Sequence, residues 1–513
     1  MKKRWPTIFL GIFFALLSIY IYNINQGGGD VVNKTFEGIN NFLSKFLFFD
    51  ITFGLIKGAS FPFIVAWLIA AGIFFTIRFN FINLRMLGHS LKILMGKYRT
   101  KEDKGEVSPF ASLSAALSAT VGLGNIAGVA IAVSVGGPGA TFWMIVAGFL
   151  GMTLKFTEVT LSQTYREWRP DGRIMGGAME YLSRGLKEKG WPRFGKTLAI
   201  IFAIFTIGAS LGGGNAFQVG QSMGAMQEIV PFFKEYPIAY GLIMATIVGF
   251  VIIGGIRRIA TTAEAIVPLM VLIYLSATLY ILFANYEKIP QAFALIFHEA
   301  FHPSAVAGGM LGVIVQGFKR AAFSSEAGIG SAAIVHATAS VKYPVRQGFV
   351  ALYEPFIDTV IICTMTALVI VITGVYDPHG PYAALIAADK GAALTSVAFG
   401  SVLSWFPIVL SISVTLFAFS TMISWSYYGE RAWTYVFGER YTLVYRLMFI
   451  GFIVVATITN LGNMLTFSDL LLLGMAFPNL LGLYILHGTV KKQLNEYLVK
   501  LKSGELDKEA IRN

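Results

Sequence analysis

Apolar and polar positions alternate along this chain on the scale of whole segments. Apolar stretches of about 17 to 30 residues are separated by short polar connections, and a helix of that length crosses a hydrocarbon layer of about 30 Å. The stretches are expected to be helices because a helix satisfies its own backbone hydrogen bonds in lipid. The pattern predicts an all-α integral membrane protein.

The composition supports the same fold class. Hydrophobic residues make up 55% of the 513 residues and charged residues only 13%, whereas soluble domains carry about 25% charged residues. An ordinary soluble enzyme is therefore excluded.

Lysine and arginine gather in every second connection. The basic connections are 78–104, 166–196, Arg257 with Arg258, Lys342 with Arg346, Arg431 with Arg440, and Lys491 with Lys492. Because basic loops stay in the cytoplasm, the alternation predicts about eleven spans from Phe61 onward in the cell (inner) membrane, with a cytoplasmic C-terminus. The net charge of +12 then has a topological cause, and no nucleic-acid partner is expected.

The chain begins with MKKR and the apolar stretch Thr7–Tyr22, which has the form of a signal peptide without a small-residue cleavage site. We expect an uncleaved anchor helix within residues 1–24; whether residues 1–23 are removed stays open. The remaining predicted parts are an external linker at 25–60, a first helix and basic loop at 61–108, a ten-helix core at 109–490 with halves at about 109–285 and 305–490, and a cytoplasmic tail at 491–513.

Two of the predicted spans contain residues that disfavour a continuous helix. The first carries Gly122, Gly124 and Asn125 in its middle, where each glycine costs about 1 kcal/mol relative to alanine. The second, about 200 residues later, carries Glu326 between serines and glycines, and a charge at mid-depth costs about 2.5–3.5 kcal/mol. Interrupted spans at matching positions of two five-helix halves indicate an inverted-repeat transporter with its substrate at the midplane. Close helix packing is the alternative for the glycines.

Specific motifs surround these interruptions. The run GLGNIAGVAIAVSVGGPGATFWMIVAGFLGMTLKFTE resembles the signature of the alanine or glycine:cation symporter family. Further blocks in the family's order are GNAFQ at Gly214–Gln218, GGIRRIA at Gly254–Ala260, FSSEAGIGSA at Phe323–Ala332, YPVRQGF at Tyr343–Phe349, FIDT at Phe356–Thr359 and FAFSTMISWSYYGE at Phe417–Glu430. The resemblance covers about Phe61 to His487.

The resemblance implies a LeuT-type fold, in which a 5+5 inverted repeat follows one preceding helix. It also implies sodium-driven import of a small neutral amino acid such as alanine or glycine. The N-terminal anchor departs from the family. Ser325 stands where the family usually has Asn, and Ala178 where it usually has Pro, so the substrate preference stays open.

An amino-acid zwitterion needs donors for its carboxylate and acceptors for its ammonium group. We expect the backbone N–H groups of Gly122, Leu123 and Gly124 to hold the carboxylate. The predicted partners of the ammonium group are Asn125, Gln218 and the segment Phe323, Ser324 and Ser325, and the predicted walls are Phe323 and Trp425. An interhelical hydrogen bond is the alternative for Gln218, and ordinary packing is the alternative for the two aromatic residues.

With the resemblance, a sodium site is predicted where Ser420 and Thr421 face the carbonyls of Ser118 and Val121. Hard cations prefer oxygen ligands. The alternative is that the two hydroxyls bond to their own helix. Sodium is expected as the coupling ion, and no cofactor is expected.

Three acidic residues within predicted spans are functional candidates by default. Glu326 could instead bind freed N–H groups. Glu158 lies one turn after Lys155, which favours a gate or a structural ion pair. Asp358 could gate, pair with Arg346 or take part in proton coupling, and it stays unassigned.

The only cysteine is Cys363, and the six histidines lack ligand spacing. We therefore predict that the protein is not an enzyme and holds no transition metal. The competing functional class is an ion channel or membrane sensor that uses the same unwound segments. Lipid, sodium and the amino acid are the expected partners, and the oligomeric state stays open.

Overall fold

The computed structural model describes residues 28–55, 60–169, 173–303, 309–402 and 405–510. The predicted anchor at 1–24 lies outside the described residues. Within them the chain is almost entirely helical, and a single antiparallel pair of two-residue strands, β1 (Glu167–Trp168) and β2 (Ile174–Met175), lies in the second basic connection. The prediction of an all-α membrane protein is confirmed.

Six helices in the described part of the chain are long and apolar enough to span a membrane. They are α8 (Ala140–Tyr165); α11 (Pro192–Leu211), continued through η3 (Gly212–Ala216) into α12 (Phe217–Ile229); the Thr261–Ala284 part of α15 (Ile256–Ala284); α19 (Pro344–Ala351), continued through α20 (Tyr353–Pro355) and η5 (Phe356–Cys363) into α21 (Thr364–Thr373); α24 (Phe406–Phe437); and α26 (Leu461–Lys502). A seventh span is the bent pair of α6 (Pro109–Thr120) and η1–α7 (Gly124–Gly136). Four shorter helices fall where the sequence predicts further spans: α3 (Phe63–Arg78), α14 (Pro237–Ile252), α17 (Gly309–Ser325) and α25 (Thr442–Ala456).

Shorter helices connect these spans, and the last of them, α27, follows the final span. They are α4 (Ile82–Arg85), α5 (Leu87–Leu94), α9 to α10 (Ala178–Glu188), α13 (Phe232–Glu235), α16 (Ile289–Phe301), α18 (Ala333–His336), α22 (Ala383–Ala387), α23 (Gly391–Gly400) and α27 (Glu505–Glu509).

Local signals explain where two of the central helices begin. Ser108 precedes α6 and accepts a hydrogen bond from the N–H of Ala111, while Pro109 occupies the first turn. Asn460 does the same for α26, accepting from the N–H groups of Gly462 and Asn463. Such caps satisfy backbone donors that a helix leaves free at its N-terminus.

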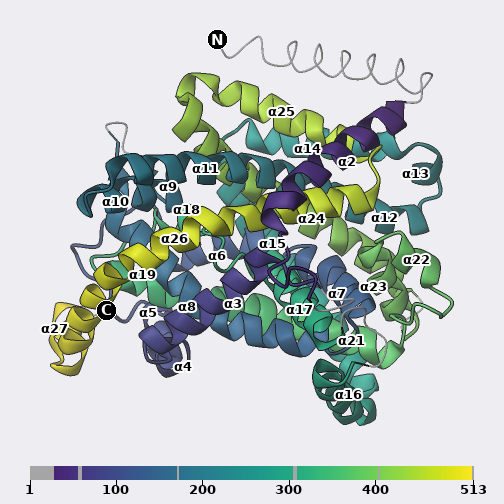
Figure 1. Ribbon diagram of the computed structural model, residues 1–513, viewed down its shortest axis with the longest axis horizontal. Coiled ribbons are helices and arrows are strands. Elements are labelled where there is room, and N and C mark those ends of the chain that lie inside the picture. The colour runs from purple at the N-terminus through teal and green to yellow at the C-terminus, as the bar shows by residue number, and fades with distance from the viewer. Residues whose placement is uncertain (1–27, 56–59, 170–172, 304–308, 403–404, 511–513) are drawn as a thin grey trace.

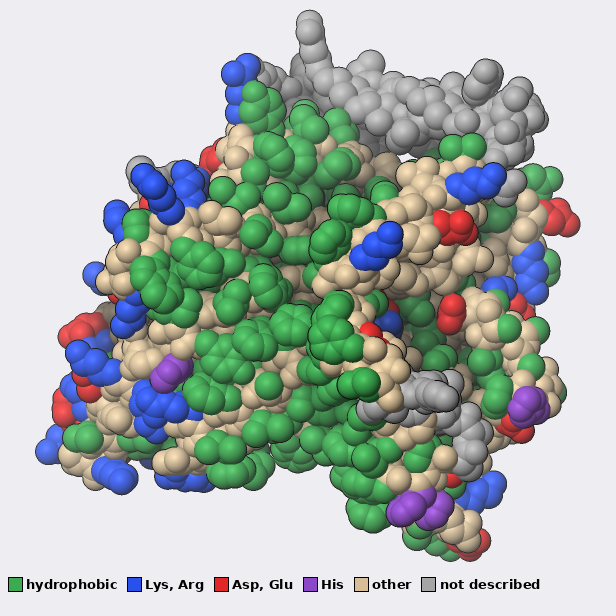
Figure 2. Space-filling view, in the orientation of Figure 1, with side chains coloured by type: hydrophobic (Ala, Val, Ile, Leu, Met, Phe, Trp, Pro, Cys, Tyr) green, Lys and Arg blue, Asp and Glu red, His purple; other side chains and the backbone are tan. Residues whose placement is uncertain are grey.

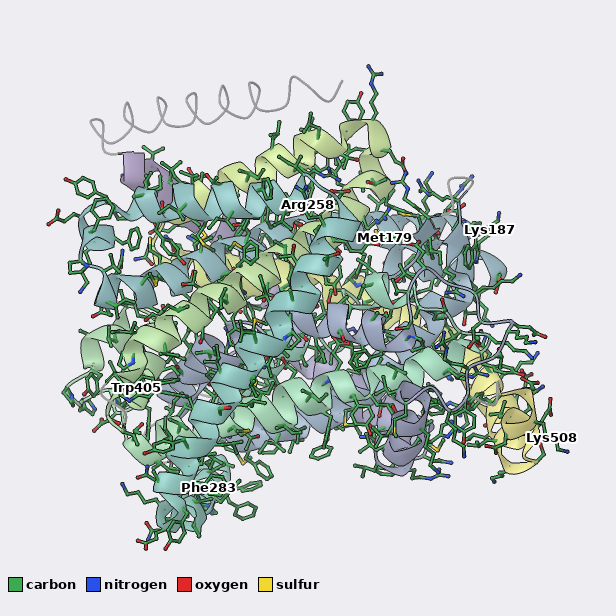
Figure 3. All side chains as sticks on the ribbon, turned by 180° about the vertical axis from the view of Figure 1, so that it is seen from behind. Met179, Lys187, Arg258, Phe283, Trp405 and Lys508 are labelled. Atoms are coloured by element: carbon green, nitrogen blue, oxygen red, sulfur yellow. The ribbon has the colours of Figure 1, made fainter. Side chains whose placement is uncertain are left out.

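Helices α24 and α26 cross the molecule with α11 packed against both, while α8 packs against α17 and α19 (Figure 1). Hydrophobic side chains cover the middle of the face in Figure 2, over α3, α25 and α26, and basic side chains gather at its left edge. Seen from behind, Lys187 and Lys508 lie at one end of the molecule and Trp405 and Phe283 at the other (Figure 3). The segregation of charge matches a protein that crosses a bilayer along this direction.

The segment predicted as an external linker contains the twenty-residue helix α2 (Gly28–Leu47). Phe36 packs edge-on against Phe467 of α26 at 5.0 Å, and Asn40 Nδ2 donates to the carbonyl of Asn463 at 3.0 Å. Helix α2 is therefore attached to the beginning of α26.

Candidate functional site

The first predicted interruption is a real break. Helix α6 ends at Thr120, η1 (Gly124–Gly128) resumes the helix, and the two parts meet at a bend of 54°. The N–H of Gly122 donates to Asn125 Oδ1 at 2.8 Å, so it does not continue the helical ladder to Ser118. The last carbonyls of α6 are thus left without their usual helical donors.

The second interruption is also a break. Helix α17 ends at Ser325, and the helix resumes only at Ala333 with α18. Glu326, Gly328 and Gly330 adopt positive φ angles of 56°, 84° and 87°. This left-handed backbone is uncommon for a residue such as glutamate, which indicates that its surroundings hold it.

The two breaks touch each other. A Cβ atom placed on Gly124 would lie 3.0 Å from the Cα of Ser324, and one on Gly122 would lie 2.3 Å from Thr421 Oγ1. Both glycines therefore interrupt the helix and also permit close approach. The two interpretations of these glycines, a helix break and close packing, are both correct.

A buried carboxylate joins the breaks. Asp358, in η5 (Phe356–Cys363), accepts hydrogen bonds from Asn125 Nδ2 at 2.6 Å and from Ser324 Oγ at 2.9 Å. It does not pair with Arg346, whose guanidinium instead meets Asp103 at 3.1 Å. Asp358 thus connects the predicted substrate residues of one break to those of the other.

A small cavity lies between the breaks, with an empty volume of about 250 Å³. Its lining residues are Ala119, Thr120, Gly122, Gly124, Gly213, Gln218, Phe323, Glu326, Thr421, Trp425 and Leu472. This set includes Gly122, Gly124, Gln218, Phe323 and Trp425 of the predicted substrate site. Leu123, Asn125, Ser324 and Ser325 do not line it.

The predicted donors for a carboxylate have internal partners in this structure. The N–H of Leu123 points to Gln218 Oε1 at 3.4 Å, and that of Gly122 points to Asn125. Gln218 also donates to the carbonyl of Gly213 at 2.9 Å. Ser325 bonds back to the carbonyl of Ala321 in its own helix. A ligand would therefore have to replace side-chain acceptors at the first break.

The predicted sodium residues come together beside the cavity. Ser118 Oγ lies 2.7 Å from Ser420 Oγ and 2.9 Å from Ser424 Oγ, all buried. Thr421 Oγ1 is buried and has no hydrogen-bond partner among the described residues. Val121 follows α6 with a ψ of 87°, so its carbonyl leaves the helical direction. Ser118 itself lies inside α6, and its hydroxyl makes the observed contacts. Oxygen atoms of this kind suit a hard cation.

The predicted acids are held in two different ways. Glu326 accepts from Trp425 Nε1 at 2.9 Å and from the hydroxyl of Ser331. Glu158 accepts from Asn479 Nδ2 at 2.7 Å. Lys155 pairs with Glu354 at 2.9 Å, and the Lys155–Glu158 ion pair that their spacing favours does not form.

The sequence reasoning missed three buried polar residues: Glu354, Asp469 and Asn479. Asp469 binds both Arg320 and Lys319, the latter at 2.7 Å. It lies about one helical turn before Leu472, which lines the cavity. Polar residues inside the apolar run of α26 were the available signal, since such residues in a membrane are functional candidates by default.

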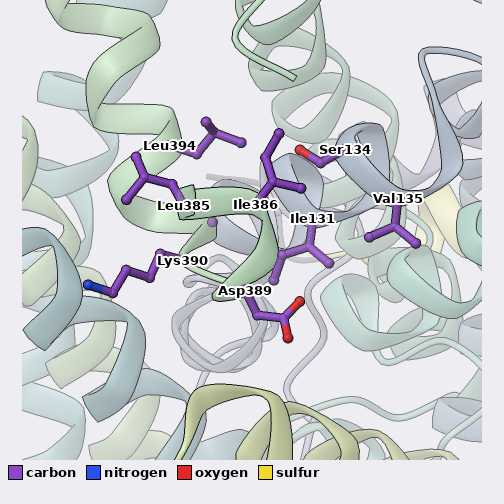
Figure 4. A pocket seen from close by; sticks show the side chains of 9 residues that line it. Ile131, Ser134, Val135, Leu385, Ile386, Asp389, Lys390 and Leu394 are labelled. Carbon is purple, nitrogen blue, oxygen red and sulfur yellow. The ribbon is translucent and has the colours of Figure 1, made fainter. Parts of the chain in front are cut away.

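Three further hollows flank the site. The largest, with an empty volume of about 1430 Å³, lies between α6, α15, α18 and α24 and reaches Val121 from the end where α6 begins. The smallest, of about 200 Å³, lies between α7 and the segment joining α22 to α23, beside Asp389 and Lys390 (Figure 4). The third, of about 300 Å³, lies between α3, α8 and α17 and touches the second break at Ser325 and Ala327. None of the three includes the residues through which the two breaks meet, Gly122, Gly124 and Ser324.

Comparison with known proteins decides the family. A family model described as "Sodium:alanine symporter family" matches residues 48–511. The chain belongs to the sodium:alanine symporter family. Membership of this family confirms the resemblance and makes the protein a multi-pass membrane transporter of the cation-coupled amino-acid symporter class.

Individual relatives extend over nearly the same region. An uncharacterized transporter of Haemophilus influenzae is 38% identical over 448 residues, covering 86% of this chain and 94% of that protein. The sodium/alanine symporter AgcS of Methanococcus maripaludis is 37% identical over 437 residues, covering 85% and 94%. The probable sodium/glutamine symporter GlnT of Bacillus subtilis is 33% identical, covering 86% and 89%. Among solved structures, MhsT in complex with L-phenylalanine aligns with 75% of this chain and 99% of that chain, at 16% identity and a TM-score of 0.45.

Proposed function

We propose that this protein imports a small neutral amino acid, such as alanine or glycine, together with sodium ions that move down their gradient. The observation that carries the proposal is the contact between the two breaks, where a small cavity and a group of buried hydroxyls share Gly122 and Thr421. Cargo and ion would then bind to the same unwound segment.

The chemistry of the cavity supports a small zwitterion. The space open to water inside it is only about 10 Å³, room for about one water molecule, so a ligand has to displace the groups that close it. Phe323, Trp425 and Leu472 supply apolar walls, and Glu326 is the only charged residue in the lining. We assign the ammonium group to the neighbourhood of Glu326 and Gln218. The carboxylate is assigned to the N–H groups of Gly122, Leu123 and Gly124, once Asn125 and Gln218 release them.

The sodium ion is assigned to Ser420, Thr421, the carbonyl of Val121 and Ser118. The unpartnered hydroxyl of Thr421 supports this assignment, because a buried polar atom without a partner costs about 1–3 kcal/mol unless a ligand satisfies it. Sodium would order the break that also binds the amino acid. Each ligand should therefore raise the affinity for the other by the same factor.

Alternating access is supported by the difference between the two sides of the cavity. On one side the Lys319–Arg320–Asp469 ion cluster closes the space between α17 and α26. On the other side, where the basic connections gather, the hollow of about 1430 Å³ reaches Val121. With the basic loops in the cytoplasm of the cell membrane, this arrangement corresponds to a state closed to the outside.

The test is uptake of labelled alanine into vesicles containing the purified protein, with and without an inward sodium gradient. We expect uptake to require the gradient, and Thr421→Ala to raise the sodium concentration needed for half-maximal uptake while leaving the order of preferred amino acids unchanged. Thr415→Ala is the matched control, because Thr415 lies on the same helix and bonds to Ser411 of its own helix. Uptake that does not depend on sodium would refute the coupling of alanine transport to sodium. Unitary currents would favour the channel alternative.

A further inference from the structure

A cluster of ionisable residues lies beside the second break, and Glu326 is the one member that has a role in the function proposed above. Lys155 and Glu158 come from α8, Glu326 from the break, His336 from α18 and Glu354 from α20 (Tyr353–Pro355). Every one of these side chains is buried, with at most 2% of its surface exposed. Three carboxyl groups therefore share one lysine in a region without solvent.

The lysine is already used. Lys155 Nζ lies 2.9 Å from Glu354 Oε1, and His336 Nε2 lies 3.3 Å from Glu354 Oε2. Among the described residues, no other cation contacts Glu158 or Glu326. If both were ionised, the cluster would carry two uncompensated negative charges, and burying an unpaired charge costs several kcal/mol.

The two remaining carboxyl groups differ in their hydrogen bonds. Glu326 accepts a donor on each oxygen, from Trp425 Nε1 and from the hydroxyl of Ser331, and such donors stabilise an ionised carboxylate. Glu158 accepts one direct hydrogen bond, from Asn479 Nδ2 to Oε1, and the backbone N–H of Gly328 adds a weaker contact; its buried Oε2 has no hydrogen-bond partner among the described residues. The uncompensated charge is therefore least tolerable on Glu158.

The missing positive charge must come from a ligand small enough to reach Glu158. None of the four hollows described above includes Glu158 in its lining. A proton needs no cavity and can bind directly to the unpartnered oxygen. We propose that Glu158 is a proton-binding site and that its proton is exchanged during the transport cycle, as a coupling ion additional to sodium.

Contacts of Glu158 connect this site to the second break. Asn479 Nδ2 donates both to Glu158 Oε1 and, at 2.9 Å, to the carbonyl of Gly328 within the break. Asn479 Oδ1 accepts from the hydroxyl of Tyr181. Because an ionised carboxylate is a stronger acceptor than a neutral acid, adding or removing the proton changes how firmly Asn479 is held against Gly328.

The charges that face Glu158 from each neighbouring element set the balance. Lys155, on its own helix, favours the ionised form, and Glu354 of α20 opposes it. Tyr181 of η2 (Tyr181–Gly185) is neutral and bonded to Asn479, and Glu326 in the break adds negative charge to the same cluster. His336 contacts Glu354 rather than Glu158. Loss of the proton would thus add a negative charge to a cluster whose single lysine is already paired.

The experiment measures alanine uptake and internal pH in proteoliposomes at a fixed sodium gradient, with the external pH varied across the range of about 5 to 8. This inference rests on the proposed symport. We expect wild-type uptake to change by up to about tenfold per pH unit where one proton binds, accompanied by alanine-dependent proton movement. Glu158→Gln keeps an acceptor for Asn479 and imitates the protonated acid. It should retain sodium-dependent uptake, with a flat pH profile and no proton movement.

The matched control is Glu180→Gln, because Glu180 is buried on the neighbouring α9 but already has a cation, Arg184, at 2.9 Å. It should keep the wild-type pH profile. If Glu158→Gln does not fold, Glu158→Asp replaces it and should shift the pH profile. Identical profiles for the wild type and the Glu158 variant, or a wild type indifferent to pH, would overturn the inference.

Failure of the proposed symport would look different. Uptake that does not require sodium would refute the symport alone. In that case infrared titration of the purified protein still decides the proton site, because wild type should show the carbonyl band of a buried protonated carboxylic acid that Glu158→Gln lacks. A wild type without that band would overturn the proton site, whatever the result for sodium.

Discussion

Asp358 Oδ1 accepts a 2.6 Å hydrogen bond from Asn125 Nδ2. This bond joins the span formed by α19 to α21, the seventh of the expected core, to the break in the first core span. The same carboxylate accepts from Ser324 at the second break. Because both breaks are bonded to one buried group, a change in position at either break alters the hydrogen bonding at the other. This arrangement gives a physical basis for coupling between ligands that bind at the two breaks.

Replacing Asp358 with Asn should weaken sodium-dependent alanine binding. The variant keeps the shape but removes the charge that strengthens the bonds from Asn125 and Ser324. Hydrogen bonds to charged groups contribute about 1.5–3 kcal/mol, so the apparent affinity should fall by about 10- to 150-fold. Equilibrium binding of labelled alanine at several sodium concentrations measures this. Asp377→Asn, in an exposed loop, is the control. Equal affinities for the two variants would contradict the role of Asp358.

Gly122 and Gly128 form a matched pair on the first broken helix. A Cβ on Gly122 would lie 2.3 Å from Thr421 Oγ1, whereas one on Gly128 would meet nothing closer than 3.8 Å. Overpacking of this kind costs about 1–3 kcal/mol, so Gly122→Ala should reduce alanine uptake by about 5- to 150-fold. Gly128→Ala should transport normally. Initial rates in vesicles, normalised to the amount of folded protein, test the pair, and equal rates would contradict the close approach at Gly122.

The sequence could predict where the membrane helices break but not how the breaks are joined. Gly122, Asn125 and Glu326 interrupt apolar runs, and their cost in a continuous helix is a local property. The bonds of Asp358 reach residues 233 and 34 positions away, Asn125 and Ser324, so they depend on packing. The same reason explains Lys155, whose nearest acidic neighbour in sequence is Glu158 but whose partner in space is Glu354.

Helix α2 shows a signal that the sequence reasoning did not use. The segment is predicted as an external linker, yet Val32, Phe36, Asn40 and Leu43 recur at helical spacing and form the face turned toward the protein. The number of spans stays a prediction, because α3, α14, α17 and α25 are too short to be recognised as membrane spans by length alone. The inverted repeat, which depends on that number, stays a prediction too.

The Lys319–Arg320–Asp469 ion cluster should contribute strongly to stability. Asp469 is buried and binds both Arg320, which is 1% exposed, and Lys319. Asp469→Asn leaves a buried guanidinium without its anion, and breaking a buried pair on one side costs about 3–5 kcal/mol. We expect a clear fall in the thermal unfolding temperature of the purified protein in detergent. Lys319→Gln should have a smaller effect, because Asp469 keeps Arg320. The double variant Arg320→Met with Asp469→Leu should recover part of the loss.

An unchanged unfolding temperature for Asp469→Asn would contradict the closed cluster. Faster alanine uptake by this variant, without loss of stability, would instead indicate that the cluster limits opening to the outside.

The C-terminal helix α27 is docked on the basic connection before α19, and this contact should depend on pH. Glu509 accepts from Lys342 Nζ at 3.0 Å and from the hydroxyl of Tyr343. Burial acts to raise the pKa of Glu509, but the hydrogen bonds from Lys342 and Tyr343 outweigh it and lower that pKa below its ordinary 4.5. The hydrogen bond to Glu509 raises the pKa of Lys342 above its ordinary 10.5.

A lowered carboxyl pKa means that the contact is fully present above pH 4.5 and is lost as the pH falls through the folded-state value. For Lys342 the contact is present below pH 10.5 and is lost as the pH rises through the raised value. A spin label at Lys508→Cys should therefore be immobile at neutral pH and become mobile in acid; the native Cys363 is buried and is not expected to react. Glu509→Gln should make the label mobile at neutral pH. Glu505→Gln should not, because Glu505 binds Lys500 on the preceding helix. A label that stays immobile in Glu509→Gln would show that other contacts hold the tail.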